Sequence, residues 1–252
     1  MNFRRCVIVG DVHGCLDEFR ALLNLVSFVQ GRDRLVQVGD LMDRGPDPVG
    51  CVRFARKLGA EVLMGNHEEK HVRFRKHEAN RQATGKKNPM KPFPLEKVAQ
   101  NAALSDEEVA WMAALPMTLN LGNGLMAVHA GLEPAFSFQD QSKAVLRVRY
   151  VNANGKMVGF TEGSLDQPPS TVYWTEQWKG PESVVYGHAV HSLTDPRVDS
   201  VSGNGKCFGI DTGCVFGGRL TAMVLNPGRE PEFAQVQAQR EYFPKNRDGH
   251  DA

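Results

Sequence analysis

The sequence predicts a layered α/β fold for this chain of 252 residues. Short apolar runs recur along it, and each ends in small and polar residues, which is typical of strands buried between layers. Segments with helical spacing separate the first of these runs, and strand alternating with helix indicates an α/β arrangement. The runs are residues 6–9, 35–38, 62–64, 125–128, 184–186, 208–210 and 220–225.

The helices and turns follow from local patterns. Apolar residues recur at helical spacing in 19–26 and again in 52–58, which predicts one helix after each of the first two strands. Ser105 and Glu108 form a capping-box pattern that predicts a helix through Trp111 and Leu115. Three Asn-Gly pairs, at 123–124, 154–155 and 204–205, predict tight hairpins, so we expect more antiparallel strands in the second half.

The domain organisation follows from shifts in composition. We expect one main domain over residues 1–228, a mostly helical cap or insertion over about 70–118, and a polar C-terminal tail over 229–252 that is frayed at its end. Residues 70–91 are strongly basic and contain a single acid, Glu78. This segment could steer a polyanion, although an exposed helix face is the more common meaning of such a run.

The composition limits the class of protein. Hydrophobic residues make up 41% and charged residues 23%, as in ordinary globular domains, and a net charge of +1 does not favour bulk binding to a polyanion. The five cysteines contain no C-x-x-C pair and predict free thiols. The apolar run at 6–9 is too short for a signal peptide, and no run approaches the roughly 20 apolar residues of a membrane span. We therefore expect a soluble, cytoplasmic protein with no membrane contact.

Metal-capable side chains follow five of the apolar runs directly. Because ligand sites gather at the carboxyl ends of strands in layered α/β folds, we expect these side chains to meet at one edge. Imidazole, carboxylate and amide groups suit two divalent ions, with manganese expected first and cobalt, iron, zinc or magnesium possible. Asp40 is our choice for the carboxylate that bridges the two ions. The predicted ligands are Asp11, His13, Asp40, Asn66, His129 and His188.

The motifs that carry these residues resemble, in order and spacing, those of the calcineurin-like metallophosphoesterases. They are Gly-Asp-Val-His-Gly at 10–14, Gly-Asp-Leu-Met-Asp-Arg-Gly at 39–45, Gly-Asn-His-Glu at 65–68, His-Ala-Gly at 129–131 and Gly-His at 187–188. The resemblance is to the phosphoprotein phosphatase branch, which includes the diadenosine tetraphosphatases. It implies a four-layer α/β/β/α sandwich with the helical insertion. It also implies one metal held by Asp11, His13 and Asp40, and another by Asp40, Asn66, His129 and His188.

The same resemblance assigns roles near the metals. It implies that His67 is the general acid, that Asp43 orients it, and that Arg44 clamps a substrate phosphate. The order Asn66-His67 independently places an acid beside a metal ligand, where it can reach a leaving oxygen. The planar guanidinium of Arg44 can bind two phosphate oxygens at once.

Later segments resemble the diadenosine tetraphosphatases in particular. These are residues 185–188, 210–221 and 146–150, the last matching a segment that supplies phosphate-contacting arginine. Arg147 and Arg149 are two residues apart, so in a hairpin strand both would point to one face and could hold extra phosphates, or form a solvated face. The chain departs from these enzymes at Ala189, where they usually have an aromatic residue, and at Phe216, where they usually have Trp.

The predicted function is hydrolysis of dinucleoside polyphosphates. By the resemblance, a metal-bridging hydroxide attacks phosphorus in line and converts diadenosine tetraphosphate to two ADP. The alternatives are a serine, threonine or tyrosine protein phosphatase, a pyrophosphohydrolase for capped or triphosphorylated RNA 5′ ends, and a non-catalytic interaction module, which should have lost ligands. The oligomeric state stays open. Four aromatic residues could stack on bases, although core packing is expected for any one of them: Tyr150, Phe160, Trp174 and Phe216.

Overall fold

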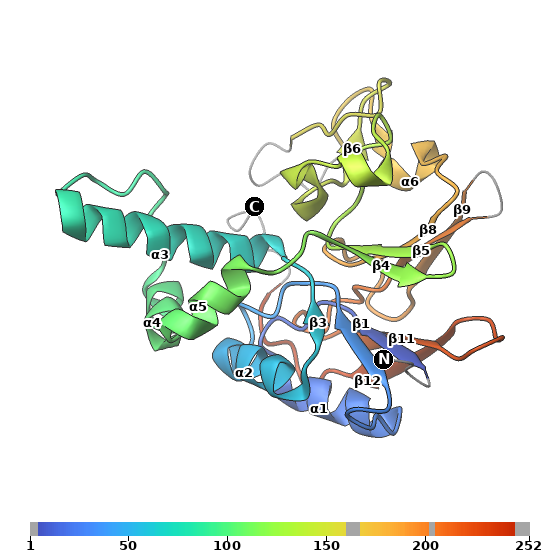
Figure 1. The fold of residues 1–252 in the computed structure, drawn as a ribbon, viewed down its shortest axis with the longest axis horizontal. Coiled ribbons are helices and arrows are strands. Elements are labelled where there is room, and N and C mark those ends of the chain that lie inside the picture. Colours follow the sequence, from blue (N-terminus) through green and yellow to red (C-terminus); the bar gives the residue numbers. More distant parts are fainter. Residues whose placement is uncertain (1–4, 160–166, 202–204, 245–252) are drawn as a thin grey trace.

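Two five-stranded sheets form the centre of the molecule (Figure 1). The computed structural model describes residues 5–159, 167–201 and 205–244. The first sheet has the strand order β12-β11-β1-β2-β3, with β1, β2 and β3 parallel and β11 antiparallel to both of its neighbours. Its strands are β1 (Cys6–Val9), β2 (Arg34–Gln37), β3 (Glu61–Val62), β11 (Arg219–Leu225) and β12 (Glu232–Gln237).

The second sheet has the order β4-β5-β8-β10-β9, in which β5, β8 and β10 are parallel and the two edge strands are antiparallel to their neighbours. A short hairpin, β6 (Tyr150–Val151) with β7 (Val172–Tyr173), forms a separate two-stranded sheet. The strands of the second sheet are β4 (Thr118–Gly122), β5 (Leu125–Val128), β8 (Ser183–Tyr186), β9 (Arg197–Ser200) and β10 (Lys206–Gly209).

The alternation of side chains along β1 explains the layers. Val7 and Val9 face the helices α1 (Leu16–Leu25) and α2 (Pro48–Leu58), whereas Ile8 between them faces the second sheet and packs in one cluster with Val185. The outer face of the second sheet is covered by the 3-10 helices η1 (Phe138–Asp140) and η2 (Lys143–Leu146), the β6–β7 hairpin and α6 (Trp174–Gln177). The predicted four-layer sandwich is therefore confirmed, with an outer layer made of short elements.

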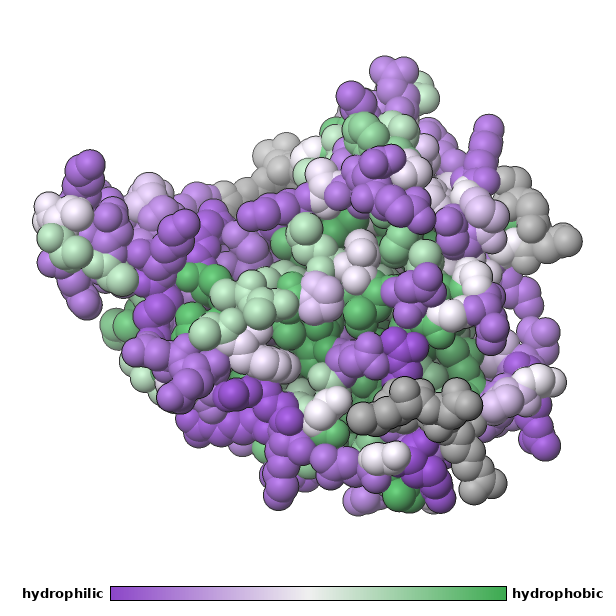
Figure 2. Space-filling model, in the orientation of Figure 1, coloured by the Kyte–Doolittle hydropathy of each residue, from purple (hydrophilic) through white to green (hydrophobic). Residues whose placement is uncertain are grey.

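Three helices occupy the stretch expected to be a helical insertion: α3 (Asn66–Thr84), α4 (Leu95–Ala103) and α5 (Asp106–Ala113). α3 projects away from the sheets, and mostly hydrophilic residues cover this projecting part on the face shown in Figure 2. Several cations of the basic segment form ion pairs nearby: Arg73 with Glu69, Arg81 with Glu78 and Arg75 with Asp106. These pairs favour the exposed-helix interpretation of the segment. Within the described residues, no helix combines the length and apolarity needed to cross a membrane.

The prediction of a polar C-terminal tail is wrong for residues 232–237, which form β12. β12 pairs along its whole length with β11, and the chain beyond it returns to α1, where the Gln239 backbone N–H and the Tyr242 hydroxyl both donate to Glu18 Oε1. The polar composition misled the prediction because β12 is an edge strand with half-buried and exposed residues. The predicted frayed end, residues 245–252, lies outside the described residues.

The turn predictions are confirmed where they can be followed. Asn123 and Gly124 join β4 to β5 with φ values of 51° and 71°, as a tight hairpin requires. Gly155 lies in a second tight turn, in which the backbone N–H of Asn152 donates to Lys156 O. The third pair includes Asn204, which lies outside the described residues. All five cysteines are free thiols, as expected.

The capping box at the start of α5 gives a stability prediction. Ser105 Oγ accepts a hydrogen bond from the Glu108 backbone N–H at 3.2 Å. The Glu108 carboxylate in turn accepts one from the Ser105 backbone N–H at 2.8 Å. We expect Ser105→Ala to lower the free energy of unfolding by about 1 kcal/mol, because it leaves a helix N–H without its partner. Urea denaturation would measure it, with Ser137→Ala as the control because the Ser137 hydroxyl bonds the exposed Asp140 carboxylate and makes no cap hydrogen bond to a backbone N–H of η1.

Candidate metal centre

The loops that follow strands of both sheets meet at one edge of the sandwich. Asp11 and His13 follow β1, Asp40 follows β2, and Asn66 begins α3 after β3. His129 and His188 follow β5 and β8 of the second sheet. The first five side chains are almost completely buried and His188 is half-buried. The sequence-predicted positions are therefore brought together.

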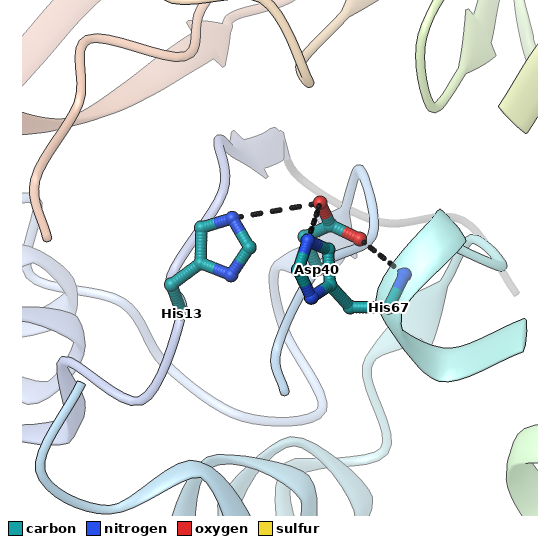
Figure 3. A group of neighbouring side chains, drawn as sticks. All are labelled: His13, Asp40 and His67. Atoms are coloured by element: carbon teal, nitrogen blue, oxygen red, sulfur yellow. Dashed lines mark hydrogen bonds and ion pairs between the residues drawn. The ribbon is translucent and has the colours of Figure 1, made fainter. Parts of the chain in front are cut away.

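Asp40 lies at the centre of this group. Its Oδ2 is 3.5 Å from His13 Nε2, 3.9 Å from His67 Nε2 and 3.3 Å from His129 Nε2, and Figure 3 shows the first two rings facing it. Among the described residues, two sets of metal-capable atoms within 4.8 Å of one another include Asp40: His13, Asp40 and His67 in one, and Asp40, His129 and His188 in the other. Asp40 belongs to both, which is the position that a bridging carboxylate requires.

Backbone carbonyls orient two of the imidazoles. His13 Nδ1 lies 2.8 Å from Met42 O, and His129 Nδ1 lies 2.9 Å from Val38 O. When Nδ1 donates to a carbonyl, Nε2 carries the lone pair, which is the usual way in which a protein fixes a metal-binding histidine. In both residues this Nε2 is the nitrogen that faces Asp40.

The donor set suits cations. Asp11 Oδ1 is buried and has no hydrogen-bond partner in the part of the chain that the structure describes, while Asp11 Oδ2 accepts from the His188 backbone N–H at 2.9 Å. Burial and the neighbouring carboxylates of Asp211 and Asp40 raise the pKa of Asp11 well above its usual range. Burial also raises the pKa of Asp211, to about 6. A bound cation would satisfy the orphaned oxygen and relieve this repulsion between carboxylates, so the residues fit divalent metal ions.

The imidazoles divide in their pKa values. Burial, followed by the nearby Arg44 guanidinium, lowers the pKa of His13 well below its usual value, and burial with Arg149 does the same for His188. Burial acts in the same direction on His129, but the Asp40 carboxylate outweighs it and raises the pKa of His129. Neutral His13 and His188 have the lone pairs that metal ligands need.

The backbone at this edge is strained. Among the described residues, eight that are not glycine have φ in the left-handed region, and five of the eight belong to the candidate site. Their φ values run from 42° to 70°, a region in which residues other than glycine are uncommon. Such strain is typical of sites where side chains must point in a fixed direction. The five residues are His13, Asp40, Asp43, Arg44 and His188.

His67 and Asp43 form the core of a second, adjoining group. His67 Nδ1 lies 2.5 Å from Asp43 Oδ2, while the other oxygen of Asp43 lies 2.8 Å from His71 Nε2. Lys97 of α4 places its Nζ 3.1 Å from Asp43 Oδ2. Burial opposes ionisation of Asp43, but His67 and His71 outweigh it and hold its pKa well below the usual range. Asp43 is thus an ionised anchor for the His67 ring.

Three supporting residues were missed in the sequence analysis. His71 and Lys97 contact Asp43, and Glu68 accepts hydrogen bonds from the backbone N–H groups of Asp40 and Met42 at 2.8 and 2.9 Å. Glu68 therefore joins the start of α3 to the loop that carries Asp40. His71 follows His67 by four residues on the same helix face, so helical periodicity was the signal that could have found it. No local pattern marks Lys97, because α4 is brought there by tertiary packing.

Arg44 lies beside the metal-capable group. Its Nη1 is 2.6 Å from His13 Nε2, and its guanidinium lies over the Phe216 ring with the Cζ 5.3 Å from the centroid. Phe216 is buried and belongs to the core cluster around α1 and α2. The aromatic ring therefore packs against one face of the planar guanidinium and helps to hold it in place.

The predicted hairpin strand through Arg147 and Arg149 is wrong. Arg147 follows the 3-10 helix η2 directly, and β6 begins only at Tyr150. The period-two argument failed because alternating apolar and basic residues also suit a short helix that buries Val145 and Leu146. Arg147 Nη2 contacts Glu69 Oε2 at 2.9 Å, and Arg149 Nη2 donates to His188 O at 3.3 Å. Both arginines therefore lie near the site, although in a different local structure.

Core packing is confirmed for two of the aromatic candidates. Trp174 is completely buried in the cluster on the outer face of the second sheet, and Phe216 is buried beneath Arg44. Tyr150 packs partly buried against the same cluster as Trp174. Phe160 lies outside the described residues. Ala189 is buried in that cluster too, which leaves no space for a larger aromatic side chain without repacking.

Gly187 gives a test of the Asp11 position. A Cβ at residue 187 would lie 1.9 Å from Asp11 Oδ1, and Asp11 is a short buried side chain that cannot move aside freely. We expect Gly187→Ala to weaken manganese binding by about 10- to 100-fold, the range typical of disturbed metal sites. Isothermal titration calorimetry would measure it. Gly159→Ala is the matched control, since no atom of the described residues beyond its chain neighbours lies within 4 Å of its added Cβ, and equal affinities in the two variants would contradict the assignment of Asp11.

Comparison with known proteins is consistent with this geometry. The family model of the calcineurin-like phosphoesterases matches residues 4–219. A symmetrical bis(5′-nucleosyl)-tetraphosphatase of Methylococcus capsulatus is 28% identical, over 86% of this chain and 90% of that protein. The asymmetrical bis(5′-nucleosyl)-tetraphosphatase PrpE of a Geobacillus strain is 30% identical, over 91% of each chain.

A solved structure, assigned only provisionally as a diadenosine tetraphosphatase, aligns with a TM-score of 0.73 and 29% identity over 93% of each chain. The family is one of hydrolases that use divalent metal ions, and the donor set described above fits such ions. The family model covers most of the chain, including every predicted metal ligand. This chain therefore belongs to the calcineurin-like phosphoesterases.

Proposed function

We propose that this hydrolase acts on dinucleoside polyphosphates and cleaves diadenosine tetraphosphate symmetrically to two ADP. The observation that carries the proposal is the shared position of Asp40 between two sets of metal-capable side chains, with Arg44 beside them. Such a site presents cations to one phosphate group and a guanidinium to the next. The names of the relatives in two branches, both tetraphosphatases, support this substrate class.

Two divalent ions would be held by the predicted residues, one by Asp11, His13 and Asp40. The other would be held by Asp40, Asn66, His129 and His188. When bound, the ions would supply a water of lowered pKa and neutralise charge on the phosphate. Manganese is the first choice, and metal analysis of the purified protein would identify the ion actually held.

The chain's own side chains complete the reaction. His67, held through Nδ1 by Asp43, turns its Nε2 towards Asp40 Oδ2 at 3.9 Å and can pass a proton to a leaving oxygen. Arg44 can bind two oxygens of the α-phosphate, next to the β-phosphate that is attacked at the metals. Arg147 and Arg149 can bind phosphates further along the chain, and Arg147 would then exchange its contact with Glu69 for a phosphate oxygen.

Asymmetric cleavage to ATP and AMP is the second candidate. Its support is specific, because the Geobacillus relative that is 30% identical is named asymmetrical. The two outcomes differ in which phosphorus lies at the metals and not in the chemistry of the site. The products therefore distinguish the two candidates.

The test is to incubate manganese-loaded protein separately with diadenosine tetraphosphate, a phosphopeptide and a capped RNA oligonucleotide, and to resolve the products by chromatography. ADP as sole nucleotide product supports the proposal, and ATP with AMP supports the asymmetric candidate. A higher kcat/KM for the phosphopeptide or for the RNA end would overturn both in favour of the corresponding alternative. Full activity in a chelator-treated sample would rule out a metal-dependent mechanism.

A further inference from the structure

A pocket of about 630 Å³ lies beside the candidate metal centre. Its walls are the loop that carries Arg44 into α2, one face of α4, and the segment after β12 that ends at Tyr242. Arg44 belongs to both places, since it lines the pocket while its Nη1 lies 2.6 Å from His13 Nε2. A substrate whose phosphate contacts Arg44 therefore has space beside that phosphate for its next group.

The charges in the pocket do not favour a further run of phosphates. Besides Arg44 it is lined by Arg53 and Arg240. Arg53 is already bound to Glu108 at 2.7 Å, and Asp47 and Glu96 add negative charge to the lining. Cations offset in this way attract additional anions weakly. The pocket beyond Arg44 therefore suits an uncharged group.

The surface of the pocket suits a planar group. Pro46, Pro48 and the methyl groups of Ala99 and Ala103 supply apolar contacts. The Arg240 guanidinium lies over the Tyr242 ring, with Cζ 5.2 Å from the centroid, which makes an aromatic and cationic surface of the kind on which nucleobases stack.

One polar atom in the lining has unused hydrogen-bonding capacity. Gln100 lines the pocket, and its Oε1 is shielded from water without a hydrogen-bond partner among the described residues. Its Nε2 makes a long contact of 3.4 Å to Glu96 Oε1. A turn of this half-exposed side chain towards a ligand N–H would satisfy the oxygen. The exocyclic amino group of adenine is such a donor.

We propose that this pocket holds one nucleoside of the dinucleotide, with Arg44 at the boundary between phosphate and nucleoside and Gln100 as a contact to the base. The volume is within the range of about 300–1,000 Å³ that small-molecule sites occupy. This inference rests on the proposed function, and it adds the place where a nucleoside is recognised. The metal centre alone recognises phosphate, whereas this pocket distinguishes a nucleotide from other phosphate compounds.

The first test fills the pocket. Ala103→Trp places a large side chain into it from the surface of α4, and Ala102→Trp is the matched control, because Ala102 is the exposed neighbour on the same helix and does not line the pocket. We expect Ala103→Trp to lower kcat/KM for diadenosine tetraphosphate by about 10-fold or more while changing that for p-nitrophenyl phosphate by less than about twofold. Ala102→Trp should change neither.

The second test addresses the base contact. Diinosine tetraphosphate carries a carbonyl where adenine carries its amino group, so wild-type protein should prefer the adenine compound. Gln100→Leu should reduce that preference by roughly fivefold, since it keeps the size of the side chain and removes the acceptor. A preference that persists undiminished in Gln100→Leu would exclude Gln100 as the base contact.

The two proposals fail in different ways. If wild-type protein hydrolyses p-nitrophenyl phosphate but not diadenosine tetraphosphate, the proposed function is wrong and the pocket inference goes with it. If wild-type protein hydrolyses the dinucleotide, and Ala103→Trp affects both substrates equally or neither, the pocket inference alone is wrong.

Discussion

Asp40→Asn is expected to lower kcat/KM for diadenosine tetraphosphate by about 10³-fold, which corresponds to about 4 kcal/mol of transition-state stabilisation. Asn keeps the shape of the side chain and can still accept the hydrogen bond from the His67 backbone N–H to Oδ1. It removes the charge from Oδ2, the atom that faces His13 and His129. Both ligand sets should lose affinity together, because Asp40 is common to them.

Metal content and steady-state kinetics measured on the same preparation check this result. Asp211→Asn is the matched control, since Asp211 is a buried carboxylate near Asp11 and Asp40 that belongs to neither ligand set. It should lose no more than about tenfold in kcat/KM. An Asp40→Asn protein that retains two metal ions and a rate within tenfold of wild type would contradict the assignment of Asp40 as the bridging carboxylate.

His67→Asn is expected to produce the second large effect, and its size should depend on the leaving group. A phosphomonoester that releases an alkoxide or phenolate needs a proton, so we expect a loss of about 10²- to 10⁴-fold on phenyl phosphate or a phosphoserine peptide. The leaving group of a dinucleoside polyphosphate is already acidic, so the loss on diadenosine tetraphosphate should be nearer to 10-fold. Asp43→Asn should show the same pattern, because it weakens the contact that holds His67 Nδ1.

The comparison with p-nitrophenyl phosphate provides the internal control, since p-nitrophenolate is a stable anion that leaves without a proton. Phenyl phosphate and p-nitrophenyl phosphate have nearly the same shape, so a difference between their losses reports on proton transfer and not on binding. Equal losses on all of these substrates would count against His67 as the acid and leave it a positioning role.

The central part of this architecture could be predicted because strand ends and ligands coincide in the sequence. Val9, Val38 and Val128 each lie immediately before a glycine or a ligand, and the rule that sites form at the carboxyl ends of strands then brings Asp11, Asp40 and His129 together. Each of these signals is local, because it consists of a few apolar residues followed by a polar one. Such a pattern can be recognised without knowledge of the tertiary fold.

The parts that were missed depend on packing between distant segments. Nothing around Lys97 indicates a contact with Asp43, because that contact arises only after α4 has folded against α3. β12 was taken for a tail because an edge strand exposes half of its residues and carries polar side chains. The segment 147–149 was assigned to a strand because alternation in three residues cannot distinguish a strand from the end of a 3-10 helix.

The left-handed backbone at His13, Asp40, Asp43, Arg44 and His188 limits how far this protein can be made more robust without losing activity. Each such residue costs on the order of 1 kcal/mol or more, and glycine would remove that cost at any one of them. Selection for thermal stability alone would therefore favour glycine at these five positions and give a stable protein without activity. Engineers seeking a hardier variant should hold them fixed and search for gains in the helices around them.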